Sequence, residues 1–395
     1  MLKIVLLVSA VNMGDVGNAQ ETLHYLEQKI HAPLEIITID ASKDAEVIAR
    51  ELKNSKSSDP KIIIAIGDNG LKALKAAQGD ALDKAYVYWS GHQFFDSLDV
   101  KSLHIDHIAL PEFAMTESKK VSLEDVRLTA TFGVPTKNLS KEELKDSYDS
   151  WKAADKPELS KKYIIVMLPG DAPDIDGKIN VYTPESNKDL FDKVYAFWKK
   201  HADYEVLVQN GPRTGKYDID DTKKVVCNHE YKKGESPSLD KISEQFIEWL
   251  KSHDVPYKFY NFTFEVDGSK KIPHSVANQL LYLSTLTGNY CILPAESVSL
   301  LSQVTSYLDP QHIIAFAPDS MNAEHRKLLE MAFGLGYLSK FAETEGDKSV
   351  VTPTNKACRN QNDAEDAAFA IVDGFHAKFP EINLLGDSHT ASDGE

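Results

Sequence analysis

The chain has few cysteines, no long apolar run and no excess of basic residues. Its three cysteines, Cys227, Cys291 and Cys358, are widely separated and form no Cys-x-x-Cys pair. Neither a disulfide framework nor a zinc site is therefore indicated, and a reducing compartment is expected. The longest apolar runs, such as Ile4–Val8 and Ile62–Ile66, are as long as strands and much shorter than the roughly 20 residues that span a membrane.

The charge balance is acidic, with 60 acidic against 44 basic residues and a formal net charge of -16. Binding to a nucleic-acid backbone depends on clustered Lys and Arg, so no nucleic-acid partner is expected and any anion site must be local. Residues Met1 to Ala10 resemble the apolar part of a signal peptide, but polar residues follow at once. We therefore predict a first buried strand here.

Short apolar runs alternate with amphipathic segments along most of the chain. The runs predicted to be strands are Ile4–Val8, Leu34–Ile39, Ile62–Ile66, Ala85–Trp89, Ile105–Leu110, Thr129–Phe132, Tyr163–Leu168, Glu205–Val208, Tyr257–Phe264, Tyr290–Leu293 and Ile313–Phe316. The segments predicted to be helices are Gln20–Ile30, Asp44–Lys53, Leu71–Ala77, Lys188–Lys200, Leu239–Ser252, Ser275–Leu283 and Ala364–Phe379. Repeated strand–helix units predict an α/β protein with parallel, doubly wound sheets.

A polar stretch from Leu139 to Lys162 interrupts this alternation, which then restarts. We therefore predict an N-terminal Rossmann-like domain at residues 1–150 and a C-terminal one at 160–345. A last helix within residues 360–380 and a flexible tail at 386–395 complete the prediction. A cleft between the two domains is the expected ligand site.

The segment Ala295-Glu296-Ser297-Val298-Ser299 follows the apolar run that ends at Pro294, and it is typical of a strand that leads into a helix. Glu296, Ser297 or Ser299 can cap this helix, and its first N–H groups can bind an anion such as phosphate. A capped helix without a ligand is the simpler alternative.

Other polar segments also follow predicted strands. In the second domain these are Gly170-Asp171 and Arg213-Thr214-Gly215-Lys216, where the cations suit a diphosphate or form a solvated loop. In the first domain, Gly14-Asp15-Val16-Gly17 opens the first helix, where the glycines permit close approach to a ligand or form a plain strand-to-helix turn. Gly67-Asp68-Asn69-Gly70 repeats this arrangement and is also typical of a simple turn, and His92 and Glu112 end two further strands. His92 is a candidate proton carrier or a structural histidine. No GxSxG, HExxH or GxGxxG motif is present, so no catalytic metal or cofactor is expected.

Taken in order, these segments resemble the "elongated mitochondria" family of mitochondrial fission, whose members look like inverting glycosyltransferases of the GT-B type. The segment Ala295–Gln303 carries most of the resemblance, and weaker matches are Gly14, Gly17, Gln20, Gly67, Leu110–Glu112, Thr131–Pro135 and Arg213-Thr214. The resemblance implies two Rossmann-like domains, a nucleotide-sugar ligand held mainly by the second, and a last helix that crosses back to the first. Gln303 stands where the family has an acid that meets a ribose.

The chain also resembles effectors of intracellular bacterial pathogens, some of which act on ADP-ribose attached to host proteins. The leading hypothesis is therefore a hydrolase that removes ADP-ribose from a modified host protein, either in the cytoplasm or after secretion into a host cell, with mitochondria as a candidate place. Glycosyl transfer from a nucleotide sugar, and a non-catalytic adaptor at the mitochondrial surface, are the alternatives. The candidate catalytic residues are Asp15, His92, Glu112 and Asp171. The candidate ligand-binding residues are Gly14, Gly17, Gln20, Gly67, Asp68, Asn69, Gly170, Arg213, Thr214, Lys216, Glu296, Ser297, Val298, Ser299 and Gln303.

Overall fold

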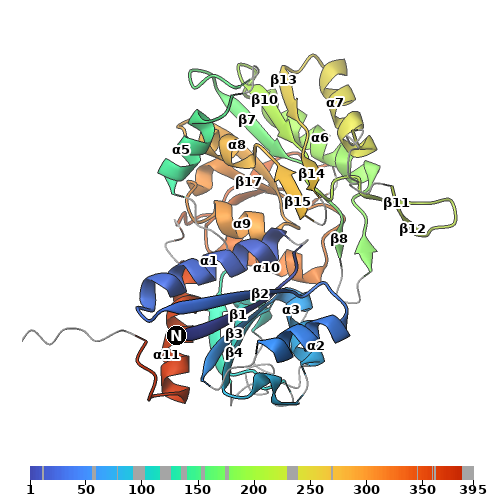
Figure 1. Cartoon of the computed structure of the whole chain (residues 1–395). Coiled ribbons are helices and arrows are strands. Elements are labelled where there is room, and N and C mark those ends of the chain that lie inside the picture. Colours follow the sequence, from blue (N-terminus) through green and yellow to red (C-terminus); the bar gives the residue numbers. More distant parts are fainter. Residues whose placement is uncertain are drawn as a thin grey trace, which may run out of the picture. The chain divides into compact units, whose positions relative to one another are not determined.

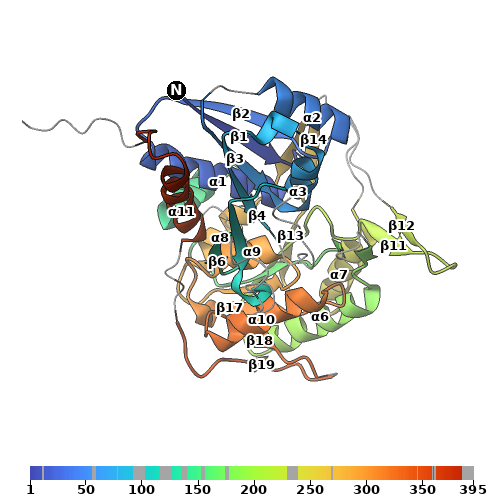
Figure 2. The ribbon, with the colours of Figure 1, turned by 90° about the horizontal axis from the view of Figure 1, so that it is seen from below.

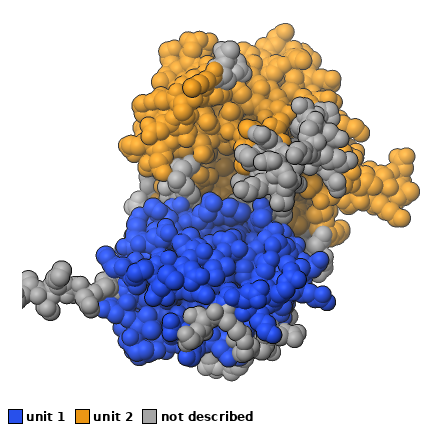
Figure 3. Space-filling view, viewed as in Figure 1, with its two compact units in different colours: residues 1–137, 361–395 blue, residues 138–360 orange. Residues whose placement is uncertain are grey.

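The chain forms two compact units, each with its own sheet, in the computed structural model (Figure 1). Unit 1 comprises Met1–Lys137 and Gln361–Glu395, and unit 2 comprises Asn138–Asn360 (Figure 3). The structure describes residues 1–10, 13–55, 59–77, 79–91, 103–115, 126–134, 140–152, 156–173, 178–228, 239–267, 270–344, 346–357, 359 and 362–384. His92 and the predicted tail 386–395 lie outside these ranges.

Unit 1 is built on a six-stranded parallel sheet with the order β2-β1-β3-β4-β5-β6. The strands are β1 (Leu2–Val8), β2 (Leu34–Asp40), β3 (Lys61–Ile66), β4 (Ala85–Ser90), β5 (His107–Pro111) and β6 (Arg127–Thr131). All six residues of β3 and of β4 are buried, as expected of central strands covered on both faces.

Helices cover both faces of this sheet. They are α1 (Met13–Lys29), α2 (Ala45–Asn54), α3 (Gly67–Ala76) and α11 (Asp363–Lys378), with the short 3-10 helices η1 (Gly79–Leu82) and η2 (Glu112–Ala114). α2 and α3 pack on one face through residues such as Ile48 and Leu74, and α1 and α11 share the core of the other. α11 comes from the far end of the chain, yet it packs side by side with α1 (Figure 2).

Unit 2 is built on a seven-stranded sheet with the order β13-β10-β7-β16-β17-β18-β19, in which only β19 is antiparallel to its neighbour. The strands are β7 (Tyr163–Met167), β10 (Glu205–Gln209), β13 (Tyr257–Tyr260), β16 (Tyr290–Pro294), β17 (Ile313–Phe316), β18 (Ser339–Phe341) and β19 (Val350–Val351). The predicted fold class, α/β with two doubly wound Rossmann-like domains, is confirmed.

The helices of unit 2 are α5 (Lys141–Asp149), α6 (Pro184–Trp198), α7 (Lys241–Ser252), α8 (Ala277–Ser284), α9 (Val298–Val304), α10 (Ala323–Gly334) and the 3-10 helix η3 (Pro310–His312). α6 and α7 contribute Phe191 and Phe246 to the core on one face. Three antiparallel hairpins complete the unit: β8 (Ala172–Pro173) with β9 (Ile179–Asn180), β11 (Tyr217–Ile219) with β12 (Val225–Cys227), and β14 (Thr263–Asp267) with β15 (Lys270–His274).

Two features differ from the sequence-based expectation. The units divide between Lys137 and Asn138 rather than at residue 150, because α5 packs on α8 of unit 2. The strand predicted at Tyr257–Phe264 is broken into β13 and β14, because Asn210 binds the two residues between them. Its side chain donates to Oδ1 of Asn261 and accepts from the backbone N–H of Phe262.

Among the described residues, no helix has the length and apolarity needed to cross a membrane.

Candidate functional site

Each parallel sheet has a point where the strand order reverses. In unit 1 this point lies between β1 and β3, and in unit 2 between β7 and β16. Successive connections leave such a point on opposite faces of the sheet, so the strand-end loops separate there and leave room for a ligand. Several sequence-predicted residues lie at these two points.

The switch point of unit 2 is closed by a contact between the loops after β7 and β16. The backbone N–H of Gly170 donates to Oε1 of Glu296 at 2.8 Å, although the residues are 126 positions apart. The hydroxyl of Ser320, after β17, donates to the carbonyl of Gly170 at 2.9 Å. A Cβ at Gly170 would lie 2.9 Å from Cβ of Arg213, so glycine permits the loop after β10 to approach as well. Four strand ends thus meet around Gly170.

Glu296 has one carboxyl oxygen held and the other without a partner. The side chain is 4% exposed, and among the described residues nothing forms a hydrogen bond with Oε2. Burial raises the pKa of Glu296 to about 7, against the opposing effects of the Gly170 N–H and the Arg213 charge. The carboxyl group therefore exchanges its proton near neutral pH, as a general acid or base must.

Asp171 is buried beside Glu296 but is bound differently. Its two oxygens accept from the backbone N–H groups of Tyr182 and Tyr217, at 2.8 and 2.9 Å. Burial raises its pKa to about 6, while the two N–H groups and the Arg213 charge lower it. With both oxygens occupied, Asp171 is suited to fixing the loops after β7 and β10, and its catalytic role stays a prediction.

The loop after β10 presents two cations. Thr214, predicted to bind the ligand, has its hydroxyl engaged within the loops, since it donates to the carbonyl of Pro169 and accepts from the N–H of Gly211. Gly215 has a φ of 60° and abuts Asp240. Arg213 and Lys216 are partly exposed, and neither forms an ion pair within the described ranges. These two cations are therefore available to an anionic ligand.

The prediction that Glu296, Ser297 or Ser299 caps α9 is wrong. Ser297 occupies the N-cap position without a side-chain cap, and Glu296 turns toward Gly170 instead. In contrast, α6, α7 and α10 are capped by Thr183, Asp240 and Asn322. Val298, Ser299 and Gln303 are partly buried in α9. Because α9 has only seven residues, its dipole is short, and Arg213 is the stronger anchor for an anion.

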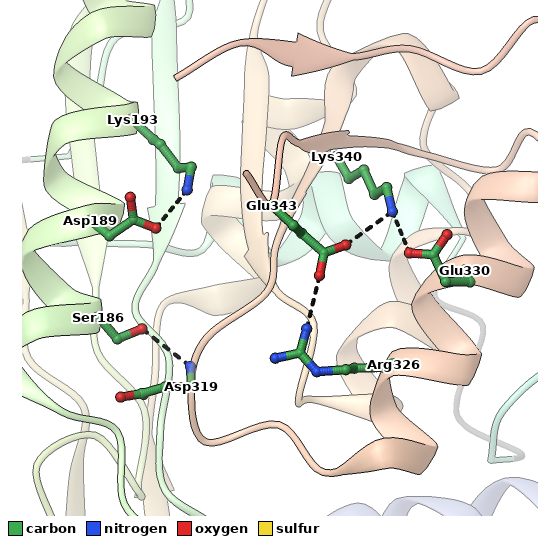
Figure 4. Close-up of polar contacts among 8 residues, drawn as sticks. All are labelled: Ser186, Asp189, Lys193, Asp319, Arg326, Glu330, Lys340 and Glu343. Carbon is green, nitrogen blue, oxygen red and sulfur yellow. Dashed lines mark hydrogen bonds and ion pairs between the residues drawn. The ribbon is translucent and has the colours of Figure 1, made fainter. Parts of the chain in front are cut away.

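Polar contacts hold the neighbouring strand ends in place (Figure 4). The backbone N–H of Asp319, after β17, donates to the Ser186 hydroxyl at 3.2 Å, and the Asp319 carboxylate binds Thr183 at the start of α6. Beside them, Glu343 bridges Arg326 of α10 and Lys340 of β18, at 2.8 and 3.0 Å. The Asp319 carboxylate therefore occupies the N-terminal end of α6.

Both glycine segments of unit 1 lie where a strand leads into a helix, as predicted, and the helix predicted from Gln20 already begins at Met13. Gly14 and Gly17 lie in the first turns of α1, and Gly67-Asp68-Asn69-Gly70 is the start of α3. Asp15 of α1 is 2% exposed, and its carboxylate abuts Gly67, which has a φ of 65°. The switch point of unit 1 thus also carries a buried carboxylate.

Further hydrogen bonds join the strand ends of unit 1. The Asn18 side chain donates to the Ser90 hydroxyl at 2.9 Å, and the Trp89 indole donates to the carbonyl of Gly67 at 3.0 Å. Gln20 is exposed in α1, and Glu112 is exposed in η2. In the described part of the chain, no group of three or more His, Cys, Asp or Glu is placed to hold a metal ion.

Sequence reasoning missed the contribution of Tyr182, Tyr217, Asp240 and Ser320. The first two act through backbone N–H groups, which carry no sequence signal. Asp240 is the second residue of the predicted helix Leu239–Ser252 and has the residue type of an N-cap, so its capping role was within reach of the sequence.

No family model matches the chain, and no curated protein matches it either. Among solved structures, Staphylococcus aureus MnaA with UDP is 12% identical, with a TM-score of 0.49, and the match covers 98% of this chain and 93% of that one. Acinetobacter baumannii MurG is 10% identical, with a TM-score of 0.42 and 86% of each chain covered. A UDP-glucosyltransferase from Polygonum tinctorium is 11% identical, with a TM-score of 0.42, and the match covers 95% of this chain and 93% of that one. Similarity at this level assigns no activity, and the resemblance to the elongated-mitochondria family stays a prediction.

Proposed function

We propose that the switch point of unit 2 binds a diphosphate-linked sugar, and that the chain is an enzyme acting on the glycosidic bond of this ligand. The observation that carries the proposal is the placement of Arg213 and Glu296 at one switch point. Arg213 lacks an ion pair among the described residues, and Glu296 has a buried oxygen without a partner. A guanidinium binds phosphate oxygens through paired N–H groups.

Glu296 suits such a ligand when it is protonated. A buried carboxylate beside a diphosphate would be repelled, whereas the neutral acid can donate its Oε2 proton to a ligand oxygen. Burial already raises the pKa of Glu296 to about 7, so little free energy is needed to protonate it near neutral pH. The same proton can assist departure of the leaving group from an anomeric carbon.

Within this class, the finer proposal is hydrolysis of protein-linked ADP-ribose, and glycosyl transfer from a nucleotide sugar is the alternative. Water serves as acceptor in the first case and a hydroxyl or amide in the second. We propose Asp15 and Glu112 of unit 1 as candidates for the base that activates the acceptor. An adaptor that binds the ligand without reaction is a third outcome.

Titration calorimetry of the full chain with ADP-ribose, ADP, UDP and a UDP-sugar tests the proposal. We expect at least one of these ligands to bind. Arg213→Ala should lower the affinity for that ligand about tenfold or more, because it removes a charge-assisted pair. Lys200→Ala is the matched control, since this exposed cation follows the C-terminal end of α6. Absence of binding by all four ligands, or unchanged binding by Arg213→Ala, would overturn the proposal.

Product analysis then separates the reactions. ADP-ribose released from a modified protein indicates hydrolysis, and a sugar found on an acceptor indicates transfer. Binding without product supports the adaptor.

A further inference from the structure

Strand β2 forms one outer edge of the sheet of unit 1, next to β1 (Figure 1). The N–H of Leu2 donates to the carbonyl of Pro33, and the N–H of Ala41 donates to the carbonyl of Val8. In an extended strand, the N–H and the carbonyl of one residue point to the same side, and those of the next residue point to the other. The odd-numbered residues of β2 therefore direct their backbone groups toward β1, and the even-numbered residues direct theirs outward.

The outward backbone groups of β2 are open over most of the strand. Within the described part of the chain, nothing forms a hydrogen bond with the backbone of Leu34, Ile36 or Thr38. The carbonyl of Asp40 accepts from the N–H of Lys43 at 3.3 Å, which closes the C-terminal end of the edge. Three successive outward residues thus present both their N–H and their carbonyl groups, and such an edge can accept another strand.

The sequence of β2 lacks the features that usually protect an edge strand. Natural edge strands are often very short or carry Lys or Pro. β2 has seven residues without Lys or Pro, and Ile36 at its centre is 39% exposed. The edge strands of unit 2 are different, because β13 carries Lys258 and β19 has two residues. An edge that is long, apolar and unprotected favours pairing with another strand.

A second copy of β2 complements this edge. Antiparallel pairing centred on Ile36 places this residue opposite Ile36 of the second copy and places Leu34 opposite Thr38. The outward residues of both strands then form hydrogen-bonded pairs, in which each pair exchanges two N–H···O bonds. The exposed Ile36 side chains meet across the two-fold axis, so the contact buries apolar surface at its centre.

The neighbouring registers are less favourable. Pairing centred on Glu35 would set two carboxylates directly opposite each other, and like charges in this position are destabilising. Pairing centred on Ile37 would set the apolar Leu34 opposite the carboxylate of Asp40. The central register instead sets Glu35 opposite Ile37, and each Glu35 keeps the ammonium group of its own Lys3 at 3.7 Å. Charge and hydrophobicity therefore select the same register.

We propose that two copies of the chain associate by antiparallel pairing of their β2 strands, centred on Ile36, which joins the two unit 1 sheets into one. A two-fold contact of this kind is closed, because each copy uses its edge once. The contact is narrow, so we expect a weak dimer with a Kd of roughly 10–100 µM. The net charge of -16 on each copy opposes association, and added salt should strengthen it by screening. The inference does not rest on the sugar ligand.

Sedimentation velocity of the full chain between about 1 and 500 µM tests the inference. Ile36→Lys should weaken dimerisation about tenfold or more, because it sets two ammonium groups opposite each other, and Ile36→Glu should do the same with two carboxylates. An equal mixture of the two variants should associate within about threefold of the wild-type affinity, since opposite charges then face each other. Association of the mixture would also show that both variants fold.

Val351→Lys is the matched control for these variants. Val351 lies on the edge strand β19 of unit 2 and is also 39% exposed, so the same substitution there should leave the dimer unchanged. Equal effects of Val351→Lys and Ile36→Lys would overturn the inference. A chain that stays monomeric at about 500 µM, or a mixture of the two Ile36 variants that fails to associate, would also overturn it.

Hydrogen exchange resolved to single amides tests the backbone contact itself. The outward N–H groups of Leu34, Ile36 and Thr38 should gain protection as the concentration rises, whereas those of Ile37 and Ile39, which bind β1, should be protected throughout. Dimerisation without added protection of the outward groups would contradict strand pairing.

The dimer and the sugar site can be tested independently. Arg213→Ala should dimerise as the wild type does, and Ile36→Lys should retain the affinity of the wild type for the sugar ligand. Failure of one proposal is thereby distinguished from failure of the other.

Discussion

A Cβ atom at Gly67 would lie 2.8 Å from each carboxylate oxygen of Asp15. Gly67 also has a φ of 65°, a conformation that residues with a side chain rarely adopt. These two properties let β3 turn directly into α3 while α1 packs against the turn. Glycine is therefore needed at position 67 for both backbone conformation and space.

Gly67→Ala should lower the free energy of unfolding of unit 1 by about 1–3 kcal/mol, through left-handed strain and overpacking against Asp15. Gly17→Ala is the matched control, because a Cβ there meets nothing within 4 Å and alanine favours the helix by roughly 0.5–1 kcal/mol. Hydrogen exchange at β1 and β3 measures both effects. Equal stability of the two variants would contradict this account.

The stability of unit 2 should depend on the proton of Glu296. Because burial raises the pKa of Glu296 from 4.5 to about 7, the folded chain holds this proton more tightly than the unfolded chain. The stabilisation that this proton contributes to the free energy of unfolding is therefore complete below pH 4.5 and is lost as the pH rises to 7 and above. Its size is about 3 kcal/mol as an order of magnitude.

Urea denaturation between pH 4.5 and 8, followed through the tryptophans of unit 2, checks this dependence. Glu296→Gln should flatten the decline, and the decline that persists should come from Asp171, whose pKa is raised to about 6 with the same sign. The exposed Glu248→Gln on α7 should leave the wild-type pH profile unchanged. A steep profile in Glu296→Gln would show that the proton resides elsewhere.

Ligand binding should also be linked to this proton. A diphosphate near Glu296 favours the protonated acid, so the affinity for ADP-ribose or a UDP-sugar should fall about tenfold between pH 6 and pH 8. These diphosphate esters do not change charge in this range, so the change reports on the protein. Calorimetry in two buffers of different ionisation enthalpy would detect the proton taken up, and Glu296→Gln should abolish the uptake. Proton release on binding would contradict the proposed contact.

The last helix should stabilise unit 1 and have little effect on unit 2. Phe375 of α11 is fully buried in the core shared with α1, so Phe375→Ala should cost about 3–5 kcal/mol. Hydrogen exchange should show faster opening of β1, β3 and β4, with β7 and β16 unchanged. Phe369→Ala on the same helix is the control, since this ring is 45% exposed under the ammonium group of Lys29.

The sequence predicted the central strands well, because strands buried on both faces appear as continuous apolar runs. Ile62–Ile66 was placed within one residue of the observed β3. Helix starts were predicted less well, since the helix predicted from Gln20 begins at Met13 and the one predicted from Leu71 begins at Gly67. Glycine marks a special backbone requirement, and the neighbouring carboxylate that creates this requirement at Gly67 comes from a distant part of the chain.

The contacts of the candidate site residues were not predicted from the sequence. Glu296 was assigned to the cap of its own helix, the contact nearest in sequence, whereas its partner is Gly170 in another strand-end loop. Thr214 was assigned to the ligand, but its hydroxyl holds the loop. The residue type determines which hydrogen bonds a side chain can form. The order of the strands in the sheet determines which partner lies close enough to form them.

The packing of α11 against α1 also determines the order in which the chain can complete its cores during synthesis. Unit 2 is continuous, so its core can form as soon as residue 360 has left the ribosome. The sheet of unit 1 emerges first, but its α11-covered face stays open until more than two hundred further residues have been made. Until α11 arrives, the nascent sheet keeps an exposed apolar face, which favours aggregation.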